Sequence, residues 1–303
     1  MTSRRRFMAV AAAAACLAPL GARAMPAETV RWRGRALGAD AEIALEHPDG
    51  TLAREALAEA LAEVERLEAV FSLYRPHSAL SRLNRDGQLA APPLDLVRAL
   101  GEAAAISAAS DGAFDATIQP LWRLHAHWLA ERGMAPPQDA VAETARLVDW
   151  RLLHVGPDRI AFGRKGMAAT LNGIAQGYVT DRVAELLRRR GFDHVLVDLG
   201  EPRVLGPHAD GTPWNIAVRD RRLPVSEGAV ATTEALGSSF AATGAFGHLI
   251  VPATGQPALA VPSVTVLAPT ATLADGLSTA LAVAGSARAR AVLGHFPGTH
   301  ALF

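Results

Sequence analysis

Residues 167–200 read MAATLNGIAQGYVTDRVAELLRRRGFDHVLVDLG. An extended start leads into a turn at residues 172–174. A helix is predicted over residues 175–190, because apolar residues recur there at a spacing near 3.6, and Gly191 suits its end. A buried strand is predicted over residues 194–199. The unit therefore places a glycine-containing turn between an extended segment and a helix that leads back to a strand.

The rest of the chain mixes helices and strands without strict alternation and without an internal repeat. Helical spacing of apolar residues is found at residues 51–71, 94–109 and 271–284. Strands are expected at residues 32–45 (with breaks at Gly34 and Gly38), 155–169 (a hairpin), 215–220, 229–233, 248–251, 263–268 and 299–303. Residues 72–86 are rich in turn formers and predict a structured loop. The mixture predicts an α+β fold with a mixed sheet, as one domain over residues 25–303.

The first 24 residues have the parts of an export signal. Arginines at positions 4–6 precede an apolar, alanine-rich run, and residues 22–24 (Ala-Arg-Ala) fit a cleavage site. The run is too short to cross about 30 Å of hydrocarbon. The arginine cluster favours twin-arginine export over the general route. We therefore expect a periplasmic protein, and lipid attachment at Cys16 is disfavoured because the usual leucine before it is missing.

The composition excludes several kinds of chemistry. The chain has 30 basic and 30 acidic residues, and removal of the signal leaves it mildly acidic, so nucleic acid is not an expected partner. Cys16 is the only cysteine, and cleavage after residue 24 removes it, which excludes disulfides, thiol catalysis and cysteine-bound zinc. Lys165 is the only lysine, and no P-loop pattern surrounds it.

Three oxygen-bearing residues share one face of the helix predicted over residues 271–284. Asp275, Ser278 and Thr279 are spaced i, i+3 and i+4. A hard cation such as Mg²⁺ prefers oxygen ligands, and a carboxylate and a hydroxyl one turn apart supply two of them. On the pattern alone, an acidic residue that suits the helix dipole is the simpler interpretation.

Two glycines straddle the predicted strand-to-helix junction. Gly173 and Gly177 are four residues apart, in a pattern that is not the dinucleotide motif GxGxxG. Backbone N–H groups at a helix start attract phosphate, and bare carbonyl groups in the turn can bind a metal. A tight turn with close helix–sheet packing explains the same glycines.

Two further motifs allow a functional or a structural interpretation. After an Asp-Gly turn, Phe114 can stack on a planar ring and Asp115 can accept a hydrogen bond from a sugar or base. Turn chemistry alone also explains the Asp-Gly pair. His248 begins a predicted strand and could act as a base near neutral pH, although a lone histidine is more often a surface residue.

Taken together and in this order, the motifs resemble the ApbE family of FAD:protein FMN transferases, from about Gly34 to the C-terminus. The motifs that carry the resemblance are FSLYRP (71–76) with Ser78 and LNR (83–85), DGAFD (111–115), NGIAQGY (172–178) with Asp181, VDLGE (197–201), residues 248–257 and residues 263–281. The NGIAQG and DLGE variants resemble the NosX-type branch, which is linked to nitrous oxide reduction.

The resemblance implies that FAD lies in a cleft with Mg²⁺ beside its pyrophosphate. Asp275 and Thr279 then match metal ligands, Ser278 a third ligand position, and Gly173 a position that gives a backbone carbonyl to the metal. The positions that match flavin-contacting residues are Leu37, Tyr74, Ala113, Phe114, Asp115, Gln176 and Ile250, and Thr170 takes a cofactor-binding position that often holds aspartate.

The implied reaction moves FMN from FAD to a threonine or serine hydroxyl of a periplasmic or membrane flavoprotein and releases AMP. Mg²⁺ draws charge from the pyrophosphate, and His248 is the candidate base for the acceptor hydroxyl. Two alternatives remain open, an FAD pyrophosphatase that yields FMN and AMP, and a non-catalytic flavin-binding assembly protein. The assembly protein is motivated by Val251 and Thr170, each of which stands where the family pattern has aspartate. A third departure is Ala253, which replaces a usual arginine.

Overall fold

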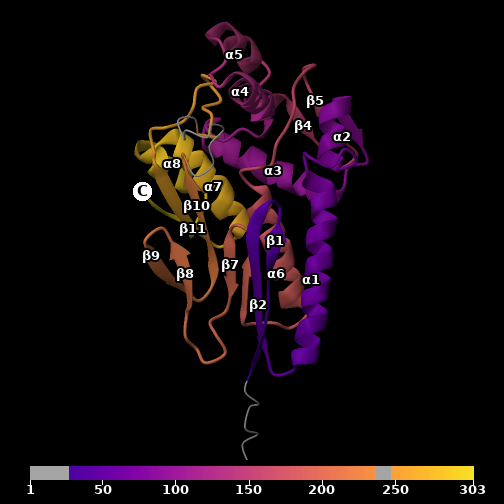
Figure 1. Ribbon diagram of the computed structural model, residues 1–303, viewed down its shortest axis with the longest axis vertical. Coiled ribbons are helices and arrows are strands. Elements are labelled where there is room, and N and C mark those ends of the chain that lie inside the picture. The colour runs from indigo at the N-terminus through magenta and orange to yellow at the C-terminus, as the bar shows by residue number, and fades with distance from the viewer. Residues whose placement is uncertain (1–26, 237–246) are drawn as a thin grey trace, which may run out of the picture.

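The computed structural model describes residues 27–236 and 247–303 (Figure 1). The expected export signal over residues 1–24, with Cys16, lies outside these residues and stays a prediction. Within the described ranges, none of the helices has both the length and the apolar character that crossing a membrane requires.

One seven-stranded sheet organises the described chain, in the order β1-β2-β6-β7-β10-β11-β12 (Figure 1). Its strands are β1 (Glu28–Ala36), β2 (Ala39–His47), β6 (Val195–Asp198), β7 (Pro202–Leu205), β10 (Gly228–Glu234), β11 (Ser263–Ala268) and β12 (His300–Leu302). Every neighbouring pair is antiparallel. The α+β class is confirmed, but the sheet is antiparallel and not mixed; the pairs β1–β2 and β6–β7 are hairpins, and the longer connections also return their strands in antiparallel pairing.

The first hairpin turns at Leu37 and Gly38 and not at Gly34. Leu37 and Gly38 have φ angles of 52° and 82°, the left-handed values that suit a two-residue turn between twisted strands. Gly34 lies inside β1, paired with Ala41. The ring of Trp32 fills the space beside it, 2.4 Å from where a Cβ would stand. Gly34 therefore makes room for an aromatic ring, and the predicted break there is wrong.

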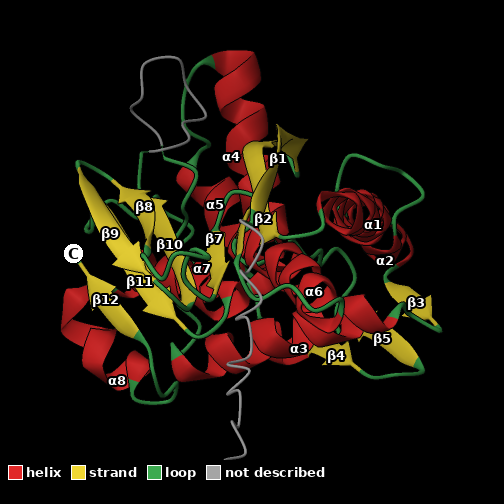
Figure 2. Cartoon of the chain, turned by 90° about the horizontal axis from the view of Figure 1, so that it is seen from below, coloured by secondary structure: helices red, strands yellow, loops and turns green. Residues whose placement is uncertain are grey.

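Helices cover one face of the sheet (Figures 1 and 2). The long ones are α1 (Gly50–Phe71), α3 (Leu94–Ala109), α6 (Ala175–Arg189) and α7 (Ala271–Ala284). Helices α1, α6 and α7 pack on the strands, and α3 packs on α1 and α7. Their apolar stripes are fully buried, as at Leu67, Val183 and Leu277. All four helices are confirmed, because the 3.6-residue period of a buried stripe is a strong signal over several turns.

A separate hairpin covers part of the opposite face. Its strands are β8 (Trp214–Val218) and β9 (Arg221–Val225). Trp214, Ile216 and Val218 pack on Ala44 and Val230 of the sheet. The neighbours of Ala44 in β2 are buried in the helical layer instead, as expected from the alternation of side chains along a strand. The hairpin and the helices therefore lie on opposite sides of the sheet.

Residues 72–86, which predict a loop, contain the helix α2 (Ala79–Asp86). Ser78 caps this helix, since its Oγ accepts a hydrogen bond of 3.0 Å from the backbone N–H of Ser81. The helix buries Leu80 and Leu83. At eight residues it spans too few turns for periodicity to separate it from a loop.

The remaining elements are short or lie at one end of the molecule. They are α4 (Gln119–Arg132), α5 (Gln138–Ala145), α8 (Ala289–Leu293), the 3₁₀ turns η1 (Ala116–Ile118), η2 (Trp150–Leu152) and η3 (Ser286–Arg288), and a small sheet of β3 (Gln88–Ala90), β4 (Leu153–Val155) and β5 (Arg159–Phe162). The predicted strand over residues 248–251 is reduced to one bridge, Ile250 to Pro257. The left-handed turn at Gly255, with φ of 67°, folds the chain back before a ladder can form.

Candidate functional site

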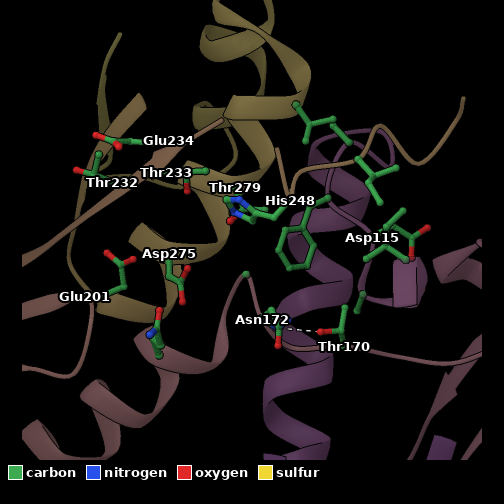
Figure 3. Close-up of a pocket in the computed structure, with 18 of the residues that line it drawn as sticks. Asp115, Thr170, Asn172, Glu201, Thr232, Thr233, Glu234, His248, Asp275 and Thr279 are labelled. Carbon is green, nitrogen blue, oxygen red and sulfur yellow. Dashed lines mark hydrogen bonds between the residues drawn. The ribbon is translucent and has the colours of Figure 1, made fainter. Parts of the chain in front are cut away.

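A cavity of about 470 Å³ opens beside the end of β10 (Figure 3), and we call it the main cavity. It is lined by residues from the segment 113–118, the turn at 170–176, Glu201, the tip of the β8–β9 hairpin, the end of β10, the segment 248–252 and α7. Ten of the predicted site residues line it, namely Ala113, Phe114, Asp115, Thr170, Gly173, Gln176, His248, Ile250, Asp275 and Thr279.

Asp275 and Thr279 reach the main cavity from consecutive turns of α7. Asp275 is buried, and its Oδ2 accepts a hydrogen bond of 3.0 Å from the backbone N–H of Gly177. Burial raises the pKa of this carboxyl from 3.8 to about 7, because a charged carboxylate is poorly solvated there. A bound cation would relieve that cost by pairing with the charge.

The glycines of the turn bring α6 and α7 together at this point. A Cβ at Gly177 would lie 2.3 Å from the carbonyl oxygen of Ala271, so only glycine allows this approach of the two helices. A Cβ at Gly173 would lie 3.0 Å from Thr279 Oγ1 and 3.2 Å from the Phe114 ring. The backbone of Gly173 therefore lies directly against the hydroxyl of Thr279.

Ser278 is not among the residues that line the main cavity. Its side chain is fully buried, and its Oγ donates to the carbonyl oxygen of Asp275 at 2.9 Å and lies 2.6 Å from Thr233 Oγ1. The hydroxyl that the resemblance implies as a third metal ligand is thus engaged with its own helix and with β10.

Glu201 also lines the main cavity, although the sequence gives it no function beyond its place in the VDLGE motif. In Figure 3 the carboxyl groups of Glu201 and Asp275 face the same hollow. Burial raises the pKa of Glu201 well above its usual value, and the charge of Asp275 adds to the effect. A hydrogen bond from the backbone N–H of Thr232 acts in the opposite direction. The two carboxyls make this end of the cavity strongly attractive to a cation.

Asp115 organises the opposite wall. Its Oδ1 accepts hydrogen bonds from the backbone N–H and the hydroxyl of Thr117, at 2.7 and 2.6 Å. Its Oδ2 accepts from the backbone N–H of Trp150 at 3.0 Å. Burial nevertheless raises the pKa of Asp115 above its usual value. The carboxyl thereby ties the segment that carries Phe114 to η2.

Thr170 stabilises the turn that precedes α6. Its backbone N–H donates to the carbonyl oxygen of Ala116 at 2.8 Å. Its Oγ1 accepts a hydrogen bond of 3.1 Å from the backbone N–H of Asn172 (Figure 3). The hydroxyl therefore fixes the turn that holds Gly173, where the family pattern often has a carboxylate.

His248 is half-buried and lines the main cavity, and Figure 3 shows its ring facing the same hollow as Asp275 and Thr279. Histidine is a common general base, because a neutral imidazole carries one ring nitrogen without a hydrogen. The structure thus puts a candidate base and the candidate metal ligands into one cavity.

Leu37 and Tyr74 line a second hollow of about 490 Å³, together with Glu68, Leu73 and Arg75. Asn172 and Gln176 line both hollows, so the second hollow adjoins the main cavity. The side chain of Tyr74 is 85% exposed. An extended ligand can therefore lie in both hollows and cover the tyrosine ring.

Asp181 is a structural residue that links α6, β7 and α7. Its carboxylate accepts hydrogen bonds of 2.9 Å from the backbone N–H groups of Ala271 and Thr272, and it forms a buried ion pair with Arg203. A carboxylate at a helix N-terminus is favourable. This contact fixes the start of α7 about one turn before Asp275.

Two of the three departures from the family pattern do not line the main cavity. Neither Val251 nor Ala253 is among its lining residues. Val251 packs against the core, and its backbone N–H donates to the carbonyl oxygen of Gln256 at 2.8 Å. Ala253 is exposed. Of the three, only Thr170 contributes to the cavity wall.

The donor groups suit a hard cation. Among the described residues, no group of three or more His, Cys, Asp or Glu side chains is placed to hold a metal. Asp275 and Thr279 offer a carboxylate and a hydroxyl, and Gly173 offers backbone beside them. Mg²⁺ is commonly held by one or two carboxylates and the phosphates of its substrate. The residues therefore fit Mg²⁺ better than zinc, whose sites are built mainly from cysteine and histidine.

The architecture is shared with solved flavin transferases. The structure superposes on the flavin transferase ApbE from Vibrio cholerae with a TM-score of 0.78 and 27% identity, over 91% of this chain and 93% of that chain. The apo flavinyl transferase ApbE from Pseudomonas stutzeri gives a TM-score of 0.77 with 26% identity, over 91% and 95%. The fold is therefore that of the flavin transferases.

The sequence agrees with the structural comparison. The ApbE family model matches residues 37–303. The chain is 31% identical over 280 residues to a FAD:protein FMN transferase of Treponema pallidum, covering 82% of this chain and 76% of that protein. The chain belongs to the ApbE family.

Proposed function

We propose that the protein transfers FMN from FAD to a threonine or serine hydroxyl of another protein, with a divalent cation and with release of AMP. The observation that carries the proposal is the meeting of Asp275, Thr279 and Gly173 in the main cavity. As a member of the ApbE family the chain is a transferase. The adjoining second hollow gives an extended dinucleotide the length of site that it needs.

Mg²⁺, when bound, supplies charge neutralisation on the diphosphate, so that the AMP half can depart. Asp275, Thr279 and the backbone carbonyl of Gly173 would hold the cation, with Glu201 adding negative charge beside it. Asp275 suits this function because its buried carboxylate has a single backbone donor among the described residues, at Gly177.

His248 would accept the proton of the acceptor hydroxyl as the hydroxyl oxygen attacks the FMN phosphorus. The new bond is the phosphoester between FMN and the protein. The bond that breaks joins the FMN phosphorus to the bridging oxygen, whose electron pair stays with AMP. Phe114 and Tyr74 offer aromatic surface for the planar parts of FAD.

The partner that fits this chemistry is a flavoprotein with an accessible threonine or serine. The signal-like residues 1–24 support export to the periplasm, where a periplasmic or membrane flavoprotein would be modified. The NGIAQG and DLGE motifs support a NosX-like branch and hence a partner in nitrous oxide reduction.

The test is incubation of the purified protein with FAD, Mg²⁺ and a candidate acceptor protein, followed by intact mass measurement and chromatography of nucleotides. The expected result is one added FMN per acceptor with an equal amount of AMP. AMP at turnover rates without acceptor modification would identify a pyrophosphatase. Tight FAD binding without AMP under any divalent cation would identify a flavin-binding assembly protein.

A further inference from the structure

The tip of the β8–β9 hairpin carries an arginine in an unfavourable backbone conformation. Val218 pairs with Arg221, so the turn consists of Arg219 and Asp220. Arg219 has a φ of 53°. Glycine is the residue that two-residue hairpin turns favour at such a position, because a side chain there crowds the backbone. Strain of this kind persists where the surrounding structure imposes it, and it is often found at functional sites.

The strained residue lies at the main cavity. Ala217, Val218 and Arg219 all line it. The Nε of Arg219 donates a hydrogen bond of 2.9 Å to Ser263 Oγ, which anchors the side chain to β11. Among the described residues this is its only hydrogen-bond partner, so Nη1 and Nη2 remain available to a ligand. The guanidinium is thus held in place by one nitrogen and can donate from the other two.

The charges around the cavity indicate which part of the reaction this arginine can assist. The other charged groups of the lining are the carboxyls of Asp115, Glu201, Glu234 and Asp275. Arg219 is the one arginine or lysine among the described lining residues. A diphosphate is an anion, and the phosphate of AMP gains a further negative charge when the bridging bond breaks. Because the carboxylates of the cavity repel the developing negative charge on the AMP phosphate, a positioned cation such as Arg219 would stabilise it.

We propose that Arg219 is a catalytic residue that binds the phosphate of the AMP half of FAD and stabilises it as it leaves. This inference rests on the proposed function. In the step concerned, the acceptor oxygen bonds to the FMN phosphorus and its proton passes to His248. The bridging oxygen departs with its electron pair on AMP, where the Nη groups of Arg219 donate to it. A planar guanidinium suits two parallel hydrogen bonds to phosphate oxygens.

The strain at Arg219 makes a sharp experiment possible. Arg219→Gly removes the cation and also places glycine where the backbone favours it, so the variant is expected to be as stable as the native protein. Arg219→Gln removes the charge and keeps much of the side chain. Arg222→Gln is the matched control, because Arg222 is an exposed arginine on the same hairpin that does not line the cavity.

The measurements are AMP affinity by calorimetry, riboflavin affinity, and kcat and KM for FMN transfer. Both Arg219 variants are expected to bind AMP about ten- to a hundredfold more weakly, as for the loss of a charge-assisted hydrogen bond. They should lose kcat by a similar factor and keep riboflavin affinity. Arg222→Gln should match the native protein in all of these.

Unchanged AMP affinity and kcat in Arg219→Gly would overturn the inference. So would a change confined to the KM for the acceptor protein, which would make Arg219 a docking residue for the partner. If the native protein itself transfers no FMN but binds AMP more tightly than Arg219→Gln does, the proposed function fails while the phosphate contact stands.

Discussion

The main cavity and the second hollow share Asn172 and Gln176, yet they are built differently. In the main cavity, Asp115 and Asp275 are buried and held by backbone N–H groups before any ligand arrives. In the second hollow, the ring of Tyr74 is 85% exposed. The difference indicates that the main cavity is preorganised for chemistry, and that Tyr74 in the second hollow gains its contacts from the ligand. Substitutions in the two places should therefore have different effects on stability and on turnover.

The largest effect is expected for Asp275→Asn. Loss of the carboxylate should lower the rate of FMN transfer by about a thousandfold, because a metal ligand contributes several kcal/mol to the transition state. The same change should raise the melting temperature of the metal-free protein at pH 8, since it removes a buried charge. Transfer assays and thermal unfolding with EDTA measure both effects. Asp139→Asn, at the exposed start of α5, is the control and should alter neither.

The second-largest effect is expected for Gly173→Ala. The new Cβ would lie 3.0 Å from Thr279 Oγ1 and 3.2 Å from the Phe114 ring, so the turn or the helix must shift. We expect transfer to slow by about ten- to a hundredfold and stability to fall by about 1–3 kcal/mol, as in overpacked sites. Gly101→Ala is the matched control, because its Cβ position has no atom within 4 Å beyond its chain neighbours and the backbone of its own helix. Being in the middle of α3, it should stabilise the protein by up to about 1 kcal/mol.

Tyr74→Ala should have a smaller effect, confined to binding. Because the ring is exposed, stability should change by no more than about 0.5 kcal/mol. The dissociation constant for FAD should rise by about two- to tenfold, since an aromatic stacking contact contributes about 0.5–1.5 kcal/mol. Fluorescence titration with FAD measures the change. A loss of stability as large as that of Gly173→Ala would contradict the contrast between the two hollows.

The smallest effect concerns pH. The pKa values of Asp275 and Glu201 are raised in the folded protein, so folding favours their protonated forms. The stability that they contribute is complete below their ordinary pKa values and is lost as the pH rises through about 7 for Asp275. In EDTA, the melting temperature should therefore be lower at pH 8 than at pH 5.5, and Mg²⁺ should reduce the difference. A difference that is the same in Asp275→Asn would assign it to other groups.

Helical periodicity in the sequence predicts which residues share a face of α7. It does not predict which other elements those residues contact. The i and i+4 spacing of Asp275 and Thr279 is local, and both residues line the main cavity. Ser278 has the same kind of spacing, but its hydroxyl lies 2.6 Å from Thr233 Oγ1 of β10, a contact between distant parts of the chain. No period in the sequence shows which strand will lie against a helix.

Other parts of the site depend on the tertiary structure in the same way. Glu201 belongs to the VDLGE motif, but its carboxyl can attract a cation only because the fold places it beside Asp275. Arg219 is exposed, as are Arg221 and Arg222, and only the folded hairpin shows that it lines the cavity. The helix α2 could not be predicted, because its eight residues span too few turns to show a helical period. Features that depend on local spacing, such as helices and the i, i+4 pair, could be predicted. Contacts between distant parts of the chain could not.

The position of the bound cation decides whether Asp275 and Thr279 are metal ligands. Crystals grown with FAD and Mn²⁺ would locate the metal by its anomalous scattering. We expect a metal about 2.0–2.3 Å from an Asp275 carboxylate oxygen and from Thr279 Oγ1, the range for hard oxygen ligands, and in contact with the diphosphate of FAD. A metal bound away from both side chains, with FAD in the cleft, would contradict this prediction.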